Sequence, residues 1–372
     1  MKYIIIFSGY NQRAVVAFLR TLAANRIENY LILAASAQDS ILKTEYASHV
    51  YAVRKHKPLD FAEITGLIRR AGEELGFVQF VVAPSTEALN RFLLQYEKEL
   101  TGLGYLTSLV HKELYEQISD KASFCALCAR HGILMPQEIA FPEAFAEAFV
   151  AKPISYFDAG GNVYSPVLVQ SQEDYEAFAR DFPQEAFYYQ RYVHGRSVYL
   201  LYYFPGKEHA DAGVLRFSQE NLMQQPGGKS ILVAKPGSFH TLAVAGQFEE
   251  LFLEVGYFGL VMVEVRLEGD QAYMIEANPR FWGPSQLFVD AGCNFFEQYL
   301  WDYGFLDSPC RNTEICRAAK YFWHGGTRPD LKKEQPVFFA GYEQKYLEEF
   351  PELAKWDLYK REDTSRLFLE YE

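Results

Sequence analysis

Two carboxylates, an amide and an arginine lie close together in residues 261–284, which read VMVEVRLEGDQAYMIEANPRFWGP. One alternating apolar run carries Glu264, a Gly-Asp turn signal follows, and a second run carries Glu276 and Asn278 just before Arg280. Oxygen ligands on a rigid strand pair suit a hard cation such as Mg2+, which one or two carboxylates usually hold together with substrate phosphates. A guanidinium suits phosphate or carboxylate. The pattern therefore predicts magnesium-nucleotide chemistry.

Strand geometry tests whether the two glutamates can share a site. Side chains alternate between the faces of a strand, and residues directly opposite on paired strands share a face. A regular two-residue turn at residues 269–270 would place Glu264 opposite Ile275 and separate the glutamates. A turn with an odd number of residues, or a compensating bulge, would place Glu264 opposite Glu276. The metal site requires one of these irregularities; the alternative interpretation is that both glutamates are solvated charges on the strand faces.

Composition limits the classes of protein to consider. The chain has 372 residues, which favours two or three domains, and 49% of them are hydrophobic. A formal net charge of −12 argues against a general affinity for nucleic acid or anionic membranes. Five cysteines, and an N-terminal apolar run too short for a signal peptide, favour the reducing cytoplasm. We therefore expect a cytoplasmic protein with small-molecule partners, no nucleic acid and no membrane.

The first 115 residues have the pattern of an α/β domain. Apolar runs typical of buried strands alternate with helical patterns, in the order strand 4–7, helix 13–24, strand 30–35, helix 61–75, strand 77–83 and helix 87–100. This alternation predicts a doubly wound parallel sheet. The first turn reads SGYN rather than GxGxxG, so a dinucleotide fingerprint is absent. The domain is either a substrate-binding unit or a scaffold.

Two lysines and a glycine pair follow this domain. Lys121 comes directly after a Ser-Asp helix start, and Lys152 ends a predicted strand that leads to Gly160 and Gly161. A lysine at a strand end followed by a glycine loop can cradle phosphate, because backbone N–H groups approach the oxygens where no side chain intervenes. The alternative interpretation of the glycine pair is an ordinary hairpin turn.

The order of these features resembles the ATP-grasp superfamily. The matching features are Asp120-Lys121, Lys152-Pro153, Gly160-Gly161, the run QRYVHG at 190–195, Glu264, and the run EANPR at 276–280. The resemblance covers residues 106–306 and is closest to carboxylate–amine ligases and carbamoyl-phosphate-synthase-like members. It implies a mixed α/β and α+β fold. The implied domains are a doubly wound pre-ATP-grasp domain (1–115), a small lobe or lid (116–195), a core lobe with the metal site (196–306) and a C-terminal extension (307–372).

The resemblance also implies ligands and the residues that bind them. ATP would be the nucleotide, and Mg2+, or alternatively Mn2+, would be the metal. The phosphates would be contacted by Lys121 and Lys152 and covered by the loop of Gly160 and Gly161. The metal would be held by Glu264, Glu276 and Asn278.

The implied adenine site includes Gln190, Arg191 and the backbone of Val193. Gln190 stands where the family often has glutamate, and an amide oxygen can still accept from an exocyclic amine. Ser197 stands where a ribose-binding glutamate is common, and its shorter hydroxyl would reach the ribose only through water.

Three cations are candidates for the catalytic clamp. Arg280 would hold the transferring phosphoryl group or the acyl phosphate. Arg266, two residues beyond Glu264, points to the same strand face. Lys229 lies in a GGKS loop that lacks the spacing of a Walker P-loop. Phosphoryl transfer depends largely on positioning and on charge neutralisation by metal and cationic side chains, which these residues would supply.

The implied activity is that of an ADP-forming carbon–nitrogen ligase. A carboxylate would attack the γ-phosphate to give an acyl phosphate, and an amine would then displace phosphate, with an amino acid or small peptide on at least one side. Two alternatives stay open: a phosphotransferase or carbamoyl-phosphate-type kinase on the same scaffold, and a non-catalytic nucleotide-binding regulator. The aromatic C-terminal tail is compatible with a homodimer.

Overall fold

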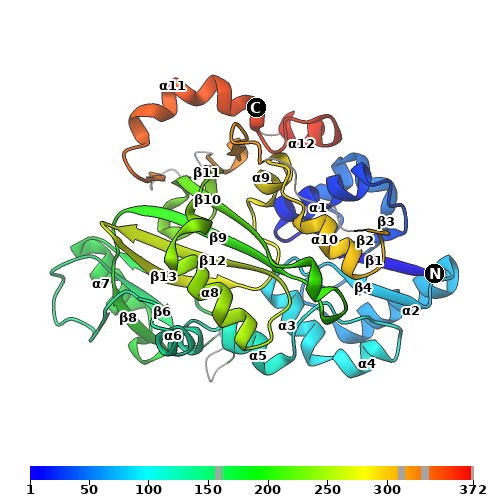
Figure 1. Cartoon of the computed structure of the whole chain (residues 1–372), viewed down its shortest axis with the longest axis horizontal. Coiled ribbons are helices and arrows are strands. Elements are labelled where there is room, and N and C mark those ends of the chain that lie inside the picture. The colour runs from blue at the N-terminus through cyan, green and yellow to red at the C-terminus, as the bar shows by residue number, and fades with distance from the viewer. Residues whose placement is uncertain (156–160, 162, 309–314, 328–334, 370–372) are drawn as a thin grey trace.

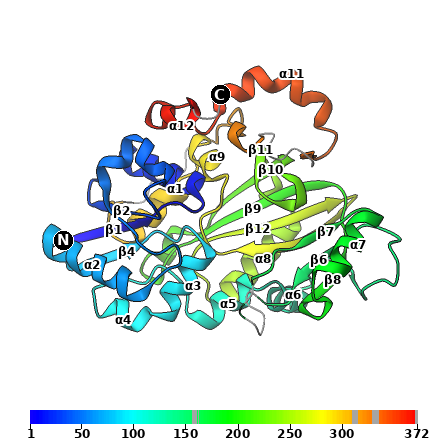
Figure 2. The same cartoon turned by 180° about the vertical axis from the view of Figure 1, so that it is seen from behind.

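The computed structural model describes residues 1–155, 161, 163–308, 315–327 and 335–369. Within these residues the strands form one parallel sheet and two antiparallel sheets. The parallel sheet of the N-terminal part and the small antiparallel sheet lie at opposite ends of the molecule, with the large antiparallel sheet between them (Figures 1 and 2). This mixed architecture confirms the predicted fold class. None of the described helices has the length and hydropathy that crossing a bilayer requires.

The parallel sheet has the strand order β3-β2-β1-β4. Its strands and the helices that follow them are β1 (Lys2–Phe7), α1 (Gln12–Ala24), β2 (Tyr30–Ala34), β3 (Val50–Val53), α2 (Phe61–Leu75), β4 (Gln79–Val82), α3 (Glu87–Gln95) and α4 (Glu97–Thr101). Ile4 and Ile6 pack in one apolar cluster with Phe18 of α1, whereas Ile5 and Phe7 pack in a second cluster with residues of α2 and α3. Both faces of the sheet are therefore covered, as predicted for a doubly wound sheet.

The small antiparallel sheet has the order β5-β8-β6-β7. Its strands and neighbouring helices are α5 (Lys112–Ser119), α6 (Lys121–Arg130), β5 (Glu138–Ile139), β6 (Phe149–Pro153), β7 (Val167–Val169), α7 (Gln172–Asp181) and β8 (Phe187–Arg191). Phe149 and Tyr189 pack against Phe178 of α7 on one face. Lys152 and Gln190 lie on the opposite face, because side chains alternate along both strands. The apolar face holds the sheet together and leaves the polar face for the site.

The large antiparallel sheet has the order β13-β12-β9-β10-β11-β14, and β15 pairs with β10. Its strands are β9 (Arg196–Phe204), β10 (Leu215–Gln224), β11 (Ile231–Pro236), β12 (Gly259–Glu268), β13 (Gln271–Asn278), β14 (Tyr321–Phe322) and β15 (Val337–Phe338). Leu200 and Tyr202 pack with Phe248 of α8 (Ala243–Glu254), whereas Tyr199 and Leu201 belong to the cluster that contains α1. The large sheet therefore packs directly on the N-terminal domain.

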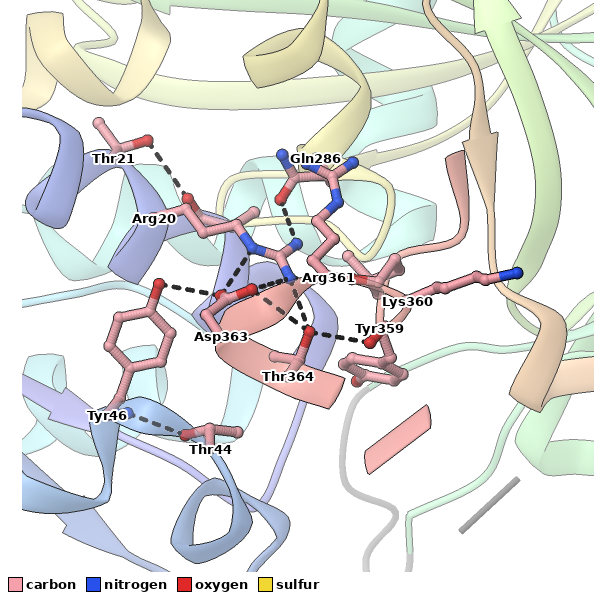
Figure 3. A network of polar contacts seen from close by, with 12 residues as sticks. Arg20, Thr21, Thr44, Tyr46, Gln286, Tyr359, Lys360, Arg361, Asp363 and Thr364 are labelled. Carbon is pink, nitrogen blue, oxygen red and sulfur yellow. Dashed lines mark hydrogen bonds and ion pairs between the residues drawn. The ribbon is translucent and has the colours of Figure 1, made fainter. Parts of the chain in front are cut away.

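The C-terminal segment, meaning the described residues of 307–372, joins the large sheet and is hydrogen-bonded to the N-terminal domain. Figure 3 shows the second of these links. The segment's strands β14 and β15 join the large sheet, and its helices are α11 (Glu343–Leu353) and α12 (Ser365–Leu369). Two further helices, α9 (Ser285–Asp290) and α10 (Phe295–Asp302), precede this segment. Arg20 of α1 donates to both carboxylate oxygens of Asp363, at 2.8 and 2.9 Å, and to Gln286 of α9 at 2.8 Å. Tyr46 also donates to Asp363, at 3.0 Å. One carboxylate thus links the N-terminal domain to the end of the chain.

Candidate active site

The two glutamates of the predicted metal set face each other across the β12–β13 hairpin. The strands meet at a two-residue turn, residues 269–270, yet Glu264 pairs with Glu276. The register shifts by one between the turn and this pair, because Ile275 is an extra residue on β13. Without the bulge Glu264 would face Ile275, and the glutamates would point to opposite faces. Of the two irregularities predicted from the sequence, an odd-residue turn or a compensating bulge, the hairpin has the bulge.

Two lysines converge on the bulge. Lys121, the first residue of α6, donates from Nζ to Glu276 Oε2 at 2.5 Å. Lys152, which is 3% exposed, donates from Nζ to the carbonyl oxygen of Ile275 at 2.9 Å. The bulge therefore has two effects: it turns Glu276 into the site, and it presents a carbonyl to a buried lysine.

Two arginines, Arg266 and Arg280, continue this group of charges. Together with Glu264, Glu276, Lys121 and Lys152 they form the charged row. Arg266 Nη2 lies 3.2 Å from Glu264 Oε1. Asn278 Nδ2 donates to Glu276 Oε1 at 2.8 Å, and Asn278 Oδ1 accepts from Arg280 Nη2 at 2.7 Å. Each carboxylate is thus paired with a cation from the chain, Arg266 for Glu264 and Lys121 for Glu276.

Burial and these charges shift the pKa values of the site. Burial raises the pKa of Glu264, and Arg266 opposes that shift. Burial also acts to raise the pKa of Glu276, but the positive groups around it, led by Lys121, lower it to about 2. Burial lowers the pKa of Lys152 to about 8, and the like charge of Lys121 adds to the effect. Shifted groups of this kind gather at functional sites.

A cavity of about 290 Å³ lies between the small and large sheets, next to these charges. Lys152 and Gln190 line it from the small sheet, and Glu264 and Glu276 line it from the large sheet. Gln190 is 3% exposed, and its Oε1 has no hydrogen-bond partner among the described residues. A buried acceptor without a partner is uncommon in proteins, and a ligand amine in the cavity would satisfy it.

A second cavity, of about 280 Å³, adjoins the first at Lys121 and Glu276. Asn278 and Arg280 line it together with Glu87 of α3. Arg280 Nε is buried and has no partner within the part of the chain that the structure describes. The charged row therefore lies where two cavities meet, so that each cavity can hold one reactant.

The remaining predicted residues differ in their positions. Arg191, Val193 and Lys229 line the first cavity. Arg191 Nη2 also donates to a carboxylate of the hairpin, Glu268, at 2.8 Å. Ser197 does not line this cavity: its side chain is fully buried, and its hydroxyl accepts from Asn221 Nδ2 at 2.9 Å.

The predicted glycine loop is described only in part. Gly161 has a left-handed φ of +80°, and nothing lies within 4 Å of the position that a Cβ would take. Gly160 lies outside the described residues.

Helix α3 of the N-terminal domain braces the site. This role was not predicted from the sequence. Arg91 donates to Asp120 Oδ1 at 2.5 Å, and Asn90 Nδ2 donates to the carbonyl oxygen of Pro279 at 3.3 Å. The helix thus holds both the start of α6, which carries Lys121, and the chain just after β13. The sequence signal was only a helical pattern over residues 87–100, which does not show what the helix contacts.

The donor set fits a hard cation held jointly with a nucleotide. Glu264, Glu276 and Asn278 supply two carboxylates and one amide oxygen on neighbouring strand positions. In the described ranges, no three His, Cys, Asp or Glu side chains gather as a metal-holding group. Mg2+ commonly takes one or two protein carboxylates and completes its shell with phosphate oxygens and water.

Comparison with known proteins identifies the fold. By sequence, no protein-family model and no curated protein matches the chain. By structure, it is similar to the biotin carboxylase domain of the Hydrogenobacter thermophilus 2-oxoglutarate carboxylase, with a TM-score of 0.59 and 13% identity over 85% of this chain and 73% of that one. It is similar to an N5-carboxyaminoimidazole ribonucleotide synthetase, with a TM-score of 0.57 and 16% identity over 80% and 76% of the two chains. It is also similar to an L-amino acid ligase from Bacillus licheniformis, with a TM-score of 0.57 and 16% identity over 86% and 78%. These solved structures are ATP-grasp enzymes, and the likeness confirms that the chain has the predicted ATP-grasp fold.

Proposed function

We propose that the chain is an ADP-forming ligase that joins a carboxylate to an amine. The observation that carries the proposal is the pair Glu264 and Glu276, of which Glu276 lines both cavities, with Lys121, Lys152 and Arg280 lining one or both of the same cavities. The structural neighbours support it, since they include an L-amino acid ligase and a carboxylase domain in complex with MgADP and bicarbonate. The proposed substrate on at least one side is an amino acid or small peptide.

ATP would occupy the first cavity. Gln190 Oε1, which is buried without a partner in the described residues, would accept from the exocyclic amine of adenine. The backbone of Val193 would contact the adenine edge, and Arg191 would line the same region. Lys121 and Lys152 would bind the phosphates, because both ammonium groups already lie at the boundary with the metal set.

Mg2+ would be held by Glu264, Glu276 and Asn278, and when bound it would neutralise charge on the terminal phosphates. In the structure the two carboxylates pair with Arg266 and Lys121. Binding of the magnesium nucleotide would let these cations turn to phosphate oxygens while the carboxylates turn to the metal. The site would thus exchange one set of ion pairs for another, and no buried charge would lose its counterion.

The substrate carboxylate would enter the second cavity. One of its oxygens attacks the γ-phosphorus, and the bond from that phosphorus to the β–γ bridging oxygen breaks. ADP is the leaving group, and the substrate becomes an acyl phosphate. The amine nitrogen then attacks the acyl carbon and loses a proton, and phosphate departs. Arg280 lines this cavity and would bind the transferring phosphoryl group, where charge develops during both steps.

Phosphorus NMR tests the proposed reaction. Protein, Mg2+ and ATP are incubated with pooled amino acids, and then with pooled dipeptides and small carboxylic acids. The expected result is substrate-dependent ADP and phosphate together with a new amide mass. A stable phosphorylated product would favour a phosphotransferase, and AMP with pyrophosphate would overturn the acyl-phosphate route. Binding of ATP without turnover in every pool would favour a nucleotide-binding regulator.

Lys152 should make nucleotide affinity depend on pH. Only its protonated form attracts phosphate, and burial lowers its pKa to about 8. Affinity is therefore expected to be complete below that value and to weaken about tenfold by pH 9. The effect on folding has the opposite sign. Because the pKa of Lys152 in the folded chain is about 8, below its ordinary 10.5, this group makes the free energy of unfolding rise as the pH increases from about 8 to 10.5.

Calorimetric titration with Mg2+ and a non-hydrolysable ATP analogue, from pH 7 to pH 9.5, measures this dependence. Lys152→Arg keeps its charge over the whole range and should flatten the curve. Lys112→Arg, a change at an exposed lysine on α5, is the matched control and should follow the wild type. The same slope in the wild type and in Lys152→Arg would assign the titration to another group.

A further inference from the structure

The C-terminal segment forms part of the wall of the first cavity. Val337 of β15 pairs with Gln224 of β10, and both residues line the cavity. Phe339 continues this path: its N–H donates to the carbonyl oxygen of Leu222 at 3.0 Å, and its side chain is buried. A segment from the last tenth of the chain therefore closes a site built by β12, β13 and the small sheet.

The ring of Phe339 covers the guanidinium of Arg266. Arg266 Cζ lies 4.4 Å from the ring centroid, within the range of cation–π attraction. The same guanidinium lies 3.2 Å from Glu264 Oε1 and lines the cavity. A guanidinium donates only in its own plane. The ring therefore occupies one side of the guanidinium, which leaves the other sides to Glu264 and to a ligand in the cavity, and it limits the rotamers that this long side chain would otherwise sample.

The neighbouring Phe338 has a different environment. It packs against the C-terminal cluster of Leu222 and Phe322, with its ring centroid 5.7 Å from that of Tyr346. Phe338 and Phe339 thus offer the same side chain at adjacent positions: Phe338 is half-buried against the C-terminal cluster, and Phe339 lies over Arg266. This pair separates a packing effect from an effect on the site.

We propose that Phe339 is a positioning residue of the ligase site, which holds Arg266 with its edge toward an oxyanion of a reactant. The proposal rests on the proposed function and makes the C-terminal segment a working part of the site. The oxyanion is a nucleotide phosphate, because Arg266 lines the first cavity, in which ATP is proposed to bind, and a guanidinium recognises phosphate by paired hydrogen bonds.

Leucine at position 339 keeps the apolar volume and removes the aromatic face. Phe339→Leu is expected to weaken binding of Mg2+ with a non-hydrolysable ATP analogue about tenfold. Phe339→Tyr, which keeps the ring, should restore affinity to within about threefold, and the control Phe338→Leu should leave it unchanged. Unchanged nucleotide affinity in Phe339→Leu, with a higher KM for the substrate carboxylate instead, would overturn the assignment of this oxyanion to the nucleotide.

A double-mutant cycle decides whether Phe339 acts through Arg266. Arg266→Met combined with Phe339→Leu should bind no more weakly than Arg266→Met alone, because the ring has no guanidinium left to hold. Arg266→Lys lacks the planar fork and should bind the nucleotide analogue about as weakly as Phe339→Leu. It gives a second measurement if Phe339→Leu does not fold. Additive losses, or equal losses in the two phenylalanine variants, would overturn this role alone. A wild-type chain that binds no magnesium nucleotide would overturn the proposed function, and this role with it.

Discussion

Replacing Glu276 with glutamine is expected to lower kcat at least about a thousandfold while the chain stays folded. The amide removes one of the two charged metal ligands and leaves Lys121 without its counterion. Glutamine can still accept a hydrogen bond from Lys121 or from Asn278, so the loss of stability should stay at about 1–2 kcal/mol.

Two readouts separate the metal role from a general loss of structure. Turnover is measured with the substrate pair found by phosphorus NMR, and the magnesium dependence of nucleotide binding is measured without a second substrate. Asp270→Asn removes an exposed carboxylate from the turn of the same hairpin and should behave as wild type in both assays. Full activity of Glu276→Gln would remove Glu276 from the metal set.

The hairpin could be predicted from the sequence because all of its determinants are local. Alternation, the Gly-Asp turn signal and the positions of Glu264 and Glu276 lie within residues 261–284, and the face that each side chain takes follows from counting along two strands. That count required either a turn with an odd number of residues or a bulge, and the structure has a bulge, at Ile275. Lys152 could be proposed from its place at a strand end before a glycine pair for the same reason, whereas the role of Lys121 followed from the resemblance to the ATP-grasp superfamily.

Features that depend on packing between distant segments could not be predicted. Phe339 is one of 30 phenylalanines in the chain, and nothing near it in the sequence indicates a contact with Arg266. Ser197 matched the ribose position of the family, but its hydroxyl accepts from Asn221 on the neighbouring strand. Strands β3 and β11 were missed: β3 is a short edge strand without a buried residue, and the one apolar run of β11 comes directly after a glycine-rich loop.

A second large effect is expected at Asp363, whose carboxylate accepts hydrogen bonds from Arg20 and Tyr46 of the N-terminal domain (Figure 3). The side chains of Arg20 and Asp363 are 11% and 16% exposed, and Arg20 donates to both carboxylate oxygens. Removal of one partner from a largely buried pair costs about 3–5 kcal/mol, because the other charge keeps its desolvation cost. Gln286 and the carbonyl of Leu358 still accept from Arg20, so Asp363→Ala should cost about 3 kcal/mol, at the lower end of that range.

Denaturant unfolding and limited proteolysis measure this effect, with Glu362→Ala as the matched control, because it removes an exposed carboxylate from the adjacent position. Asp363→Ala should unfold at a lower denaturant concentration and be cleaved earlier in the C-terminal segment. Arg20→Met combined with Asp363→Leu should be more stable than Asp363→Ala, since no buried charge is left unpaired. Phe339 lies on the same segment, so loosening its end should also weaken nucleotide binding through Arg266. Equal unfolding of the Asp363 and Glu362 variants would show that the strands β14 and β15 hold the segment without this carboxylate, and the effect on nucleotide affinity should then be absent as well.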